Sequence, residues 1–139
     1  KNLCMLASLR KSVTKADAAY AMERVGLSAE DKRTYRKYSL GMKQKLGIAN
    51  AIMGEPDIIV LDEPINALDE ASVEQLKQVL VELKKKDHLI LIACHDKEEL
   101  EYLSDEIIEM KEGRIVECRR LTKQESGGTQ DEDTENVLA

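Results

Sequence analysis

The sequence predicts an α/β fold built on parallel strands. Two short, continuous apolar runs, at residues 58–61 and 89–94, are typical of strands in a parallel sheet that is buried on both faces. The segment ASVEQLKQVLVELKKK lies between them and has the pattern of an amphipathic helix. Its predicted buried stripe consists of Val73, Leu76, Leu80 and Leu83. A strand, a helix and a strand in this order form a βαβ unit, whose crossover is normally right-handed.

The residues before this unit are predicted to form helices. The opening segment KNLCMLASLRK places leucines on roughly one face. The segment TKADAAYAMERVGL has Thr14 as its N-cap and Gly26 where a helix must stop in a left-handed conformation. Another short helix is expected to begin at Ser28, and KQKLGIANAIMGEP predicts a further one.

The residues after the unit predict a short helix and a hairpin. Asp96 is expected to cap the helix, with Glu99 three residues later as in a capping box. The segment EIIEMKEGRIVE predicts two strands that turn at Glu112 and Gly113. The chain is therefore divided into a helical segment (1–54), an α/β segment (55–118) and a polar, acidic tail that is expected to be disordered (119–139).

Composition limits the classes of function. The 139 residues suffice for one domain, and 42% of them are hydrophobic, without any Phe or Trp, so the core must be aliphatic. A net charge of −6 argues against nucleic acid as the main partner. Three cysteines without a C-x-x-C spacing fit a reducing cytosol. No apolar run approaches the roughly 18 residues of a membrane span, so we expect any membrane link to come through another subunit.

Three side chains that can carry chemistry follow the two predicted strands. Asp62 and Glu63 leave the end of the first strand, and His95 leaves the end of the second. The carboxyl ends of parallel strands form the active edge of such a sheet, so these side chains can meet there. Asp62 suits Mg²⁺, which binds through one or two carboxylates and phosphate oxygens. Glu63 could orient or deprotonate an attacking water, and His95 could contact a transferring phosphoryl group.

Each of these residues also has an ordinary structural interpretation. An Asp-Glu-Pro sequence is a common acidic turn, and a histidine after a strand is often a structural residue whose ring is already hydrogen-bonded. Neither the carboxylates nor the histidine would establish a function alone. A fourth element, the block YSLGMKQKLGIANAIMGEPDIIVLDEPINALD, joins them into one pattern.

This block resembles the ATP-binding-cassette (ABC) ATPases of membrane transporters. Their signature is commonly Leu-Ser-Gly-Gly-Gln, followed by a helix, an apolar strand that ends in Asp-Glu-Pro, a Leu-Asp turn and a histidine loop. The signature matches Tyr38, Ser39, Leu40, Gly41 and Met42, and the Walker B strand matches Ile58–Asp62, with Glu63 after it as the catalytic glutamate. The D-loop matches Asn66, Ala67, Leu68 and Asp69, and the switch histidine matches His95. The resemblance covers roughly residues 1–118, and the SLGMKQ form looks like the drug, peptide and lantibiotic export branch.

The resemblance implies a role for each matched residue. Asp62 would hold Mg²⁺, Glu63 and His95 would be catalytic, and Ser39, Gly41 and Asp69 would contact ATP. A serine and a glycine at the start of a helix suit this, because main-chain N–H groups there are available to an anion. In the family this edge contacts the γ-phosphate of ATP held by the other subunit. Met42 departs from the pattern because it removes a glutamine amide.

The phosphate loop of the family, G-x-x-x-x-G-K-[ST], is not found in these residues. We therefore expect the sequence to be the C-terminal part of a nucleotide-binding domain: an incomplete P-loop NTPase (RecA-like) core with parallel strands (55–118) and the helical signature subdomain (1–54). The complete protein is expected to hydrolyse ATP with Mg²⁺, whereas this part alone should not do so efficiently. The implied partners are a membrane-spanning permease subunit and a second nucleotide-binding domain, but no nucleic acid. The implied location is cytoplasmic, at the inner face of the cell membrane.

Two other functions remain open at this point. One is the ATPase head of a chromosome-maintenance or DNA-repair protein, which also separates the phosphate loop from the lobe that carries the signature. The other is a regulatory module that does not hydrolyse nucleotide. The proline after Glu63, the acidic charge and the absence of a long heptad run before the signature favour the transporter ATPase over the first alternative. The transported substrate is not encoded here, because selectivity lies in the membrane partner.

Overall fold

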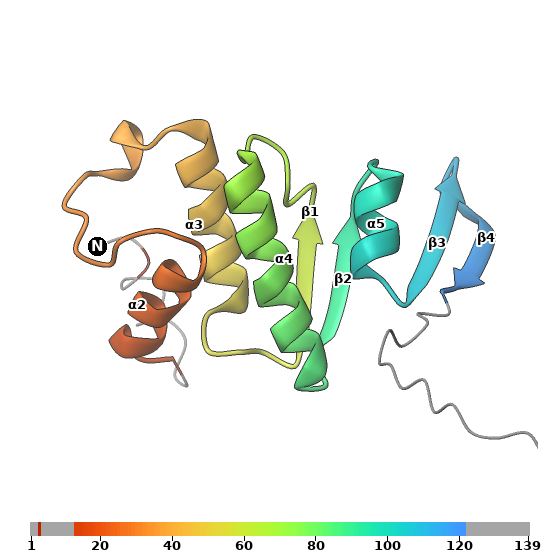
Figure 1. Cartoon of the computed structure of the whole chain (residues 1–139), viewed down its shortest axis with the longest axis horizontal. Helices are drawn as coiled ribbons and strands as arrows, with labels where there is room; N and C mark the ends of the chain where they lie inside the picture. Colours follow the sequence, from red (N-terminus) through yellow and green to blue (C-terminus); the bar gives the residue numbers. More distant parts are fainter. Residues whose placement is uncertain (1–2, 4–12, 122–139) are drawn as a thin grey trace, which may run out of the picture. The chain divides into compact units, whose positions relative to one another are not determined.

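The computed structural model describes Leu3 and residues 13–121, which belong to two compact units, Lys1–Leu103 and Ser104–Ala139. The helix predicted at the start of the sequence lies almost entirely outside the described residues, as does the predicted tail from residue 122 onward. The first unit contains α2 (Lys15–Arg24), a 3₁₀ turn η1 (Tyr35–Lys37), α3 (Leu40–Ile52), β1 (Ile58–Asp62), α4 (Glu70–Lys85), β2 (Leu89–Ala93) and α5 (Lys97–Leu103) (Figure 1). The second unit contains β3 (Glu106–Lys111) and β4 (Arg114–Arg120).

Local signals in the sequence set where α2 begins and ends. The Thr14 hydroxyl accepts a hydrogen bond from the Asp17 N–H over 3.2 Å, and the Asp17 carboxylate accepts one from the Thr14 N–H over 2.7 Å. The N–H and the hydroxyl of Thr14 both donate to the Asp17 carboxylate and lower the pKa of Asp17 below its ordinary value. The helix is followed by Gly26, which has a φ of 73°, as its position predicted. The short helix expected at Ser28 is wrong, because the Ser28 hydroxyl and carbonyl instead accept hydrogen bonds within a turn.

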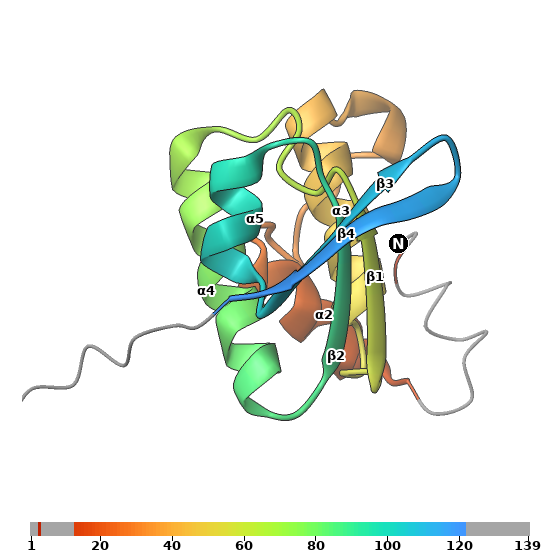
Figure 2. The same ribbon diagram turned by 90° about the vertical axis from the view of Figure 1, so that its right-hand side faces the viewer.

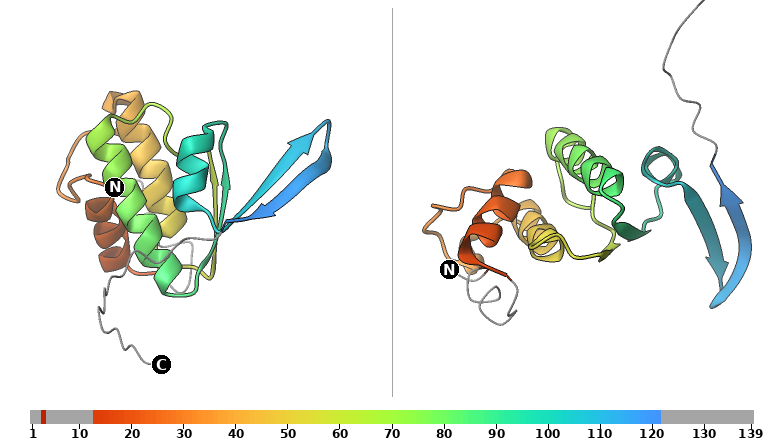
Figure 3. Two further views of the ribbon diagram at one scale, coloured as in Figure 1. Left: turned by 45° about the vertical axis from the view of Figure 1, so that its right-hand side comes forward. Right: turned by 90° about the horizontal axis from the view of Figure 1, so that it is seen from below.

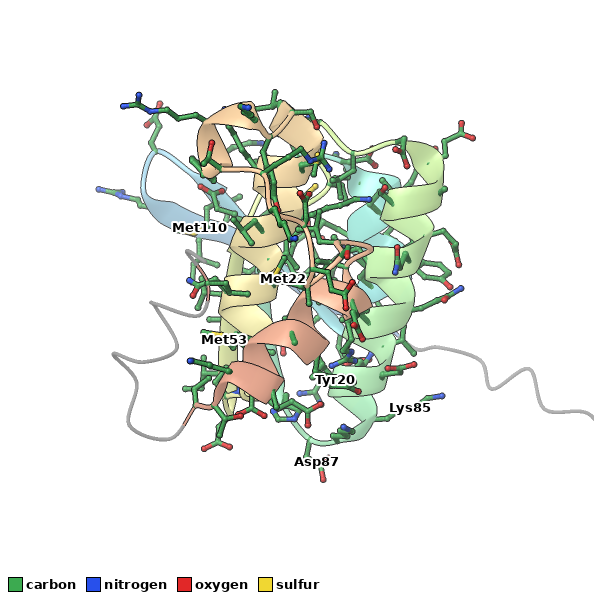
Figure 4. The ribbon with its side chains drawn as sticks, turned by 90° about the vertical axis from the view of Figure 1, so that its left-hand side faces the viewer. Tyr20, Met22, Met53, Lys85, Asp87 and Met110 are labelled. Atoms are coloured by element: carbon green, nitrogen blue, oxygen red, sulfur yellow. The ribbon has the colours of Figure 1, made fainter. Side chains whose placement is uncertain are left out.

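The core of the first unit lies between the helices and the inner face of β1. Figure 4 looks onto this side, with Met22 of α2 and Met53 at the end of α3 labelled. All core side chains are aliphatic apart from Tyr38, as the composition predicted. The best buried among them are Leu3, Ala18, Ala21, Ile48, Ala49, Ile52, Met53, Ile59, Leu76, Leu80 and Leu83. Because α3 shares this core with β1 and α4, no boundary between compact units falls at residue 54, and the division predicted there stays a prediction.

The strands β1 and β2 pair in parallel, as the βαβ pattern predicted, with Ile58 opposite Leu89 and Val60 opposite Leu91. The expectation that both faces of these strands are buried is wrong. These four side chains remain 59%, 53%, 66% and 51% exposed, respectively. The inner residue Ile59 is only 1% exposed. Side chains alternate along a strand, and α4 covers only one face of the pair (Figures 2 and 3). We call the four exposed residues the open face.

The second unit is an antiparallel hairpin that turns at Glu112 and Gly113, both with positive φ, as predicted. Its strands continue through Arg119 and Arg120, which pair with Ile107 and Glu106. The predicted tail therefore begins too early, because the cross-strand pairing extends past residue 119. Ladder hydrogen bonds among the described residues make two separate two-stranded sheets, β1–β2 and β3–β4. No helix among the described residues is long and apolar enough to cross a membrane.

Candidate functional site

The ends of β1 and β2 bring together two of the predicted site residues. Asp62 is the last residue of β1 and pairs with Ala93 of β2. Glu63 follows it, and its N–H donates a hydrogen bond to the carbonyl of Ala93 over 2.8 Å, which extends the strand pairing by one step. His95 leaves β2 two residues after Ala93. The parallel arrangement therefore places Glu63 and His95 on the same edge, as expected for parallel strands.

Glu63 and His95 are in direct contact. Nδ1 of His95 lies 2.9 Å from Oε1 and 3.0 Å from Oε2 of Glu63. The hydrogen bond to Glu63, followed by the negative charge of Glu63, raises the pKa of His95 above its ordinary value, while a smaller burial effect lowers it. The side chain of His95 is 76% exposed and that of Glu63 34% exposed, so the pair is open to a ligand. The ring of His95 is hydrogen-bonded, as the structural interpretation of this residue expected, but its exposure does not fit a core histidine.

The main chain at Glu63 has an unusual conformation for a residue with a side chain. Its φ of 44° lies in the left-handed region, where a non-glycine residue is uncommon and has to be held by its surroundings. The Glu63 carbonyl accepts a hydrogen bond from the Asn66 N–H over 3.2 Å and another from the Gln44 side-chain amide over 3.0 Å. The Asn66 amide also reaches Oε2 of Glu63 over 3.4 Å. The turn after β1 is thus shaped around Glu63.

The predicted signature residues lie at the start of α3. Ser39 is the N-cap, and its hydroxyl accepts a hydrogen bond from the Met42 N–H over 3.2 Å. Gly41 lies in the first turn, and a Cβ atom added there would come within 2.7 Å of the Ala67 carbonyl oxygen. The start of α3 therefore packs closely on the turn between β1 and α4, which only a residue without a side chain allows. Exposed N–H groups at this helix start are suited to an anion.

Asp69 has a structural role that the sequence analysis did not assign to it. It is the N-cap of α4, and Oδ1 accepts hydrogen bonds from the N–H and the hydroxyl of Ser72 over 2.8 and 2.7 Å. These bonds, with a smaller contribution from the charge of Lys45, lower the pKa of Asp69 below its ordinary value. Within residues 13–121 the carboxylate is thus bound to its own helix rather than to Glu63 or His95. Its predicted contact with ATP stays a prediction.

Gln44 was missed by the sequence analysis, although it contacts the turn at Glu63. Helical periodicity gave no signal for it, since a polar residue on a helix is usually solvated. Its place three residues after Gly41 could have indicated it, because residues i and i+3 share one helix face. Cys94, between the end of β2 and His95, is half-buried, and burial raises the pKa of its thiol.

The donor set near Asp62 fits Mg²⁺ held jointly with a ligand. Asp62 is exposed at the end of β1, so its carboxylate is accessible. Among the described residues there is no group of three or more His, Cys, Asp or Glu side chains that could enclose a metal ion. Mg²⁺ is typically bound by one or two carboxylates, water and phosphate oxygens rather than by a protein cage. A single exposed carboxylate is consistent with that mode.

Comparisons with known proteins identify the family. A family model described as "ABC transporter" matches residues 2–66. A bacitracin transport ATP-binding protein of Enterococcus faecalis is 44% identical over 118 residues, which are 84% of this chain and 38% of that protein. A lantibiotic transport ATP-binding protein of Streptococcus pyogenes is 39% identical over 95 residues, which are 68% of this chain and 42% of that protein. The chain thus spans about two fifths of the length of these two relatives.

Solved structures agree on the fold. A dimeric ATP-binding cassette in a post-hydrolysis state, bound to ADP and Pi, matches with a TM-score of 0.70 at 22% identity, over 78% of this chain and 47% of that one. The ADP conformation of an ATP-binding cassette of an ABC transporter matches with a TM-score of 0.61 at 28% identity, over 76% and 41%. These likenesses agree with a P-loop NTPase α/β fold. The family model and the relatives show that the chain belongs to the family of ABC transporter ATPase domains.

Proposed function

We propose that this chain belongs to an ATP-hydrolysing subunit that powers a membrane permease and exports a peptide antibiotic or a similar compound. The observation that carries the proposal is the contact between Glu63 and His95 at the ends of two parallel strands. The names of the relatives support the transport role, since they are bacitracin and lantibiotic transport ATP-binding proteins. They also favour transport over a chromosome-maintenance role. The proposed location is the inner face of the cell membrane, through the permease partner.

In this proposal Glu63 acts on the water that attacks the γ-phosphate. A carboxylate can accept a proton from water and orient it, and the exposed position of Glu63 leaves room for it. His95 binds the same carboxylate through Nδ1, which leaves its other ring nitrogen for the transferring phosphoryl group. Mg²⁺, held by Asp62 and phosphate oxygens, would neutralise charge on the phosphates when it is bound. The contact would thus fix both side chains relative to each other before ATP arrives.

Ser39 and Gly41 are proposed to bind the γ-phosphate of a nucleotide held by a second nucleotide-binding domain. Both lie at the N-terminal end of α3, where N–H groups and the helix dipole favour an anion. Asp69, the N-cap of α4, is proposed to line the same nucleotide from the D-loop. The dimeric cassette that this fold resembles supports a two-domain arrangement.

The experiment uses the complete protein together with its permease in vesicles. Glu63→Gln should leave ATP binding nearly intact and lower turnover by about 10²–10⁴-fold, because a general base contributes on that order. The matched control is Glu23→Gln, an exposed glutamate on α2. A Glu63→Gln variant that keeps more than about half of the wild-type turnover would refute the role of Glu63. Wild-type protein that binds no ATP would refute the proposed function itself.

A further inference from the structure

Gln44 connects the helix that carries the signature to the turn that carries Glu63. It lies on α3, five residues after the N-cap Ser39, and α3 runs beside β1 (Figures 1 and 3). Its Nε2 donates a partly buried hydrogen bond to the main-chain carbonyl of Glu63 over 3.0 Å. Glutamine side chains on a helix surface are usually solvated, and ordering one has an entropic cost. Solvation of the side chain therefore does not explain why Gln44 makes this contact.

The reason lies in the main chain at Glu63. A left-handed φ of 44° is unfavourable for glutamate unless the surroundings hold it. One hydrogen bond, from the Asn66 N–H, belongs to the turn itself, and another joins the Glu63 N–H to Ala93 on β2. The Gln44 side chain donates to the Glu63 carbonyl from α3, which is not part of this turn. It therefore holds the peptide plane from outside the turn.

The φ of Glu63 decides where both its side chain and its carbonyl point. Rotation about the N–Cα bond moves Cβ and the carbonyl group together, so a change of φ that is resisted at the carbonyl by Gln44 would also turn the carboxylate away from Nδ1 of His95. The close approach of Gly41 to the Ala67 carbonyl fixes the same turn at a second point of α3. The Gln44 hydrogen bond and the Gly41 contact both come from α3, and together they resist rotation of the turn better than either one alone. A movement of the start of α3 would therefore also move Glu63.

We infer that Gln44 is a positioning residue whose amide holds the left-handed turn at Glu63, so that the carboxylate meets His95. The inference rests on the proposed function only in giving that contact a role in hydrolysis. The inference also connects the two parts of the proposed site. The helix α3 presents Ser39 to a phosphate and also holds Glu63, whose carboxylate is proposed to activate water.

The first test needs neither nucleotide nor a partner. In the 139-residue chain, Gln44→Met keeps the length of the side chain and removes the donor. The His95 pKa, followed by the NMR signal of its ring, should fall toward the ordinary histidine value of about 6.5. Gln78→Met makes the same change on α4, where the amide donates to Glu74 over 3.5 Å, and should leave the His95 pKa unchanged. The ring signals of His88, which precedes β2, provide an internal control.

The outcomes separate positioning from ordinary packing. A lower melting temperature for Gln44→Met with an unchanged His95 pKa would show a packing role only and overturn the inference. If that variant does not fold, Gln44→Leu replaces it in the same measurement. In a Glu63→Gln background, Gln44→Met should cause no further change in the His95 pKa, because the effect passes through the carboxylate. A further change of the same size would overturn the inference as well.

The second test addresses hydrolysis by the complete protein. A misplaced catalytic group lowers turnover by up to about 10²-fold, so Gln44→Met should lower kcat about 10- to 100-fold with little change in KM. The same substitution should have no further effect in Glu63→Gln protein. If wild-type protein hydrolyses no ATP while the His95 pKa responds to Gln44→Met, the proposed function fails and the positioning role stands. If the wild-type protein hydrolyses ATP and Gln44→Met changes neither the His95 pKa nor kcat, the positioning role is overturned.

Discussion

The imidazole of His95 and the carboxylate of Glu63 form a contact with Nδ1 to Oε1 at 2.9 Å, between residues that are 32 positions apart in the sequence. The contact exists because β1 and β2 are parallel neighbours, and each residue follows the end of its strand. It is the one place where two of the predicted site side chains meet through a hydrogen bond among the described residues.

The pH dependence of this contact has a definite sign. Because Glu63 raises the pKa of His95, the contact favours the imidazolium, and its stabilising effect is fully present below the ordinary histidine pKa. The effect is lost as the pH rises through the elevated pKa of the folded state. We expect Glu63→Gln to lower the His95 pKa, as measured by NMR. Thermal melts should also show a larger destabilisation by Glu63→Gln near pH 6 than above about pH 8. A larger destabilisation at the higher pH would contradict the assignment.

His95→Ala should affect chemistry and leave the fold intact. The ring is mostly exposed, and a surface substitution usually changes the free energy of unfolding by no more than about 0.5 kcal/mol. Hydrolysis by the complete protein should fall strongly in comparison. The control is His88→Ala, whose ring nitrogen lies 2.9 Å from the Pro56 carbonyl oxygen at the opposite ends of the strands. A large fall in melting temperature for His95→Ala with unchanged specific activity would favour a structural histidine.

Two glycines on α3 should respond in opposite ways to replacement by alanine. A Cβ atom at Gly41 would lie 2.7 Å from the Ala67 carbonyl oxygen, a main-chain atom that can move only with its turn. Gly47→Ala meets nothing within 4 Å, and alanine should stabilise the helix there by about 0.5–1 kcal/mol. Gly41→Ala should therefore destabilise the protein. Denaturant unfolding of the 139-residue chain measures the change in the free energy of unfolding for both substitutions. Equal stabilisation by the two substitutions would mean that the start of α3 does not pack on this turn.

The 139-residue chain alone is expected to self-associate. The open face exposes Ile58, Val60, Leu89 and Leu91 side by side, and such apolar patches favour association with another chain. Among the described residues β2 pairs only with β1, so one of its edges can also accept a strand. Light scattering should show dimers or larger species.

A charge on the open face should reverse this behaviour. Val60→Lys should shift the chain toward monomer, whereas Leu40→Lys, at a side chain that is 71% exposed on α3, should have little effect. A monodisperse wild-type monomer would refute the expectation. A response to Leu40→Lys alone would place the association at the start of α3 instead.

Much of the local structure was determined by the sequence alone. Thr14 and Asp17 define the start of α2 because their hydrogen bonds span only three residues, and Gly26 and Gly113 adopt the positive φ for which glycine has no steric penalty. The parallel βαβ unit followed from two apolar runs and one amphipathic helix. The placement of Glu63 and His95 at one edge followed from the rule for parallel strands.

Only the tertiary structure decided the rest. A continuous apolar run cannot show which face of a strand is covered, so the exposure of Val60 depends on where α4 packs. The left-handed φ of Glu63 and its hydrogen bond from Gln44 likewise depend on α3 lying beside the end of β1. Capping and turn signals act within a few residues and are therefore encoded locally. A contact between residues 19 positions apart exists only after the helix and the strand have packed together.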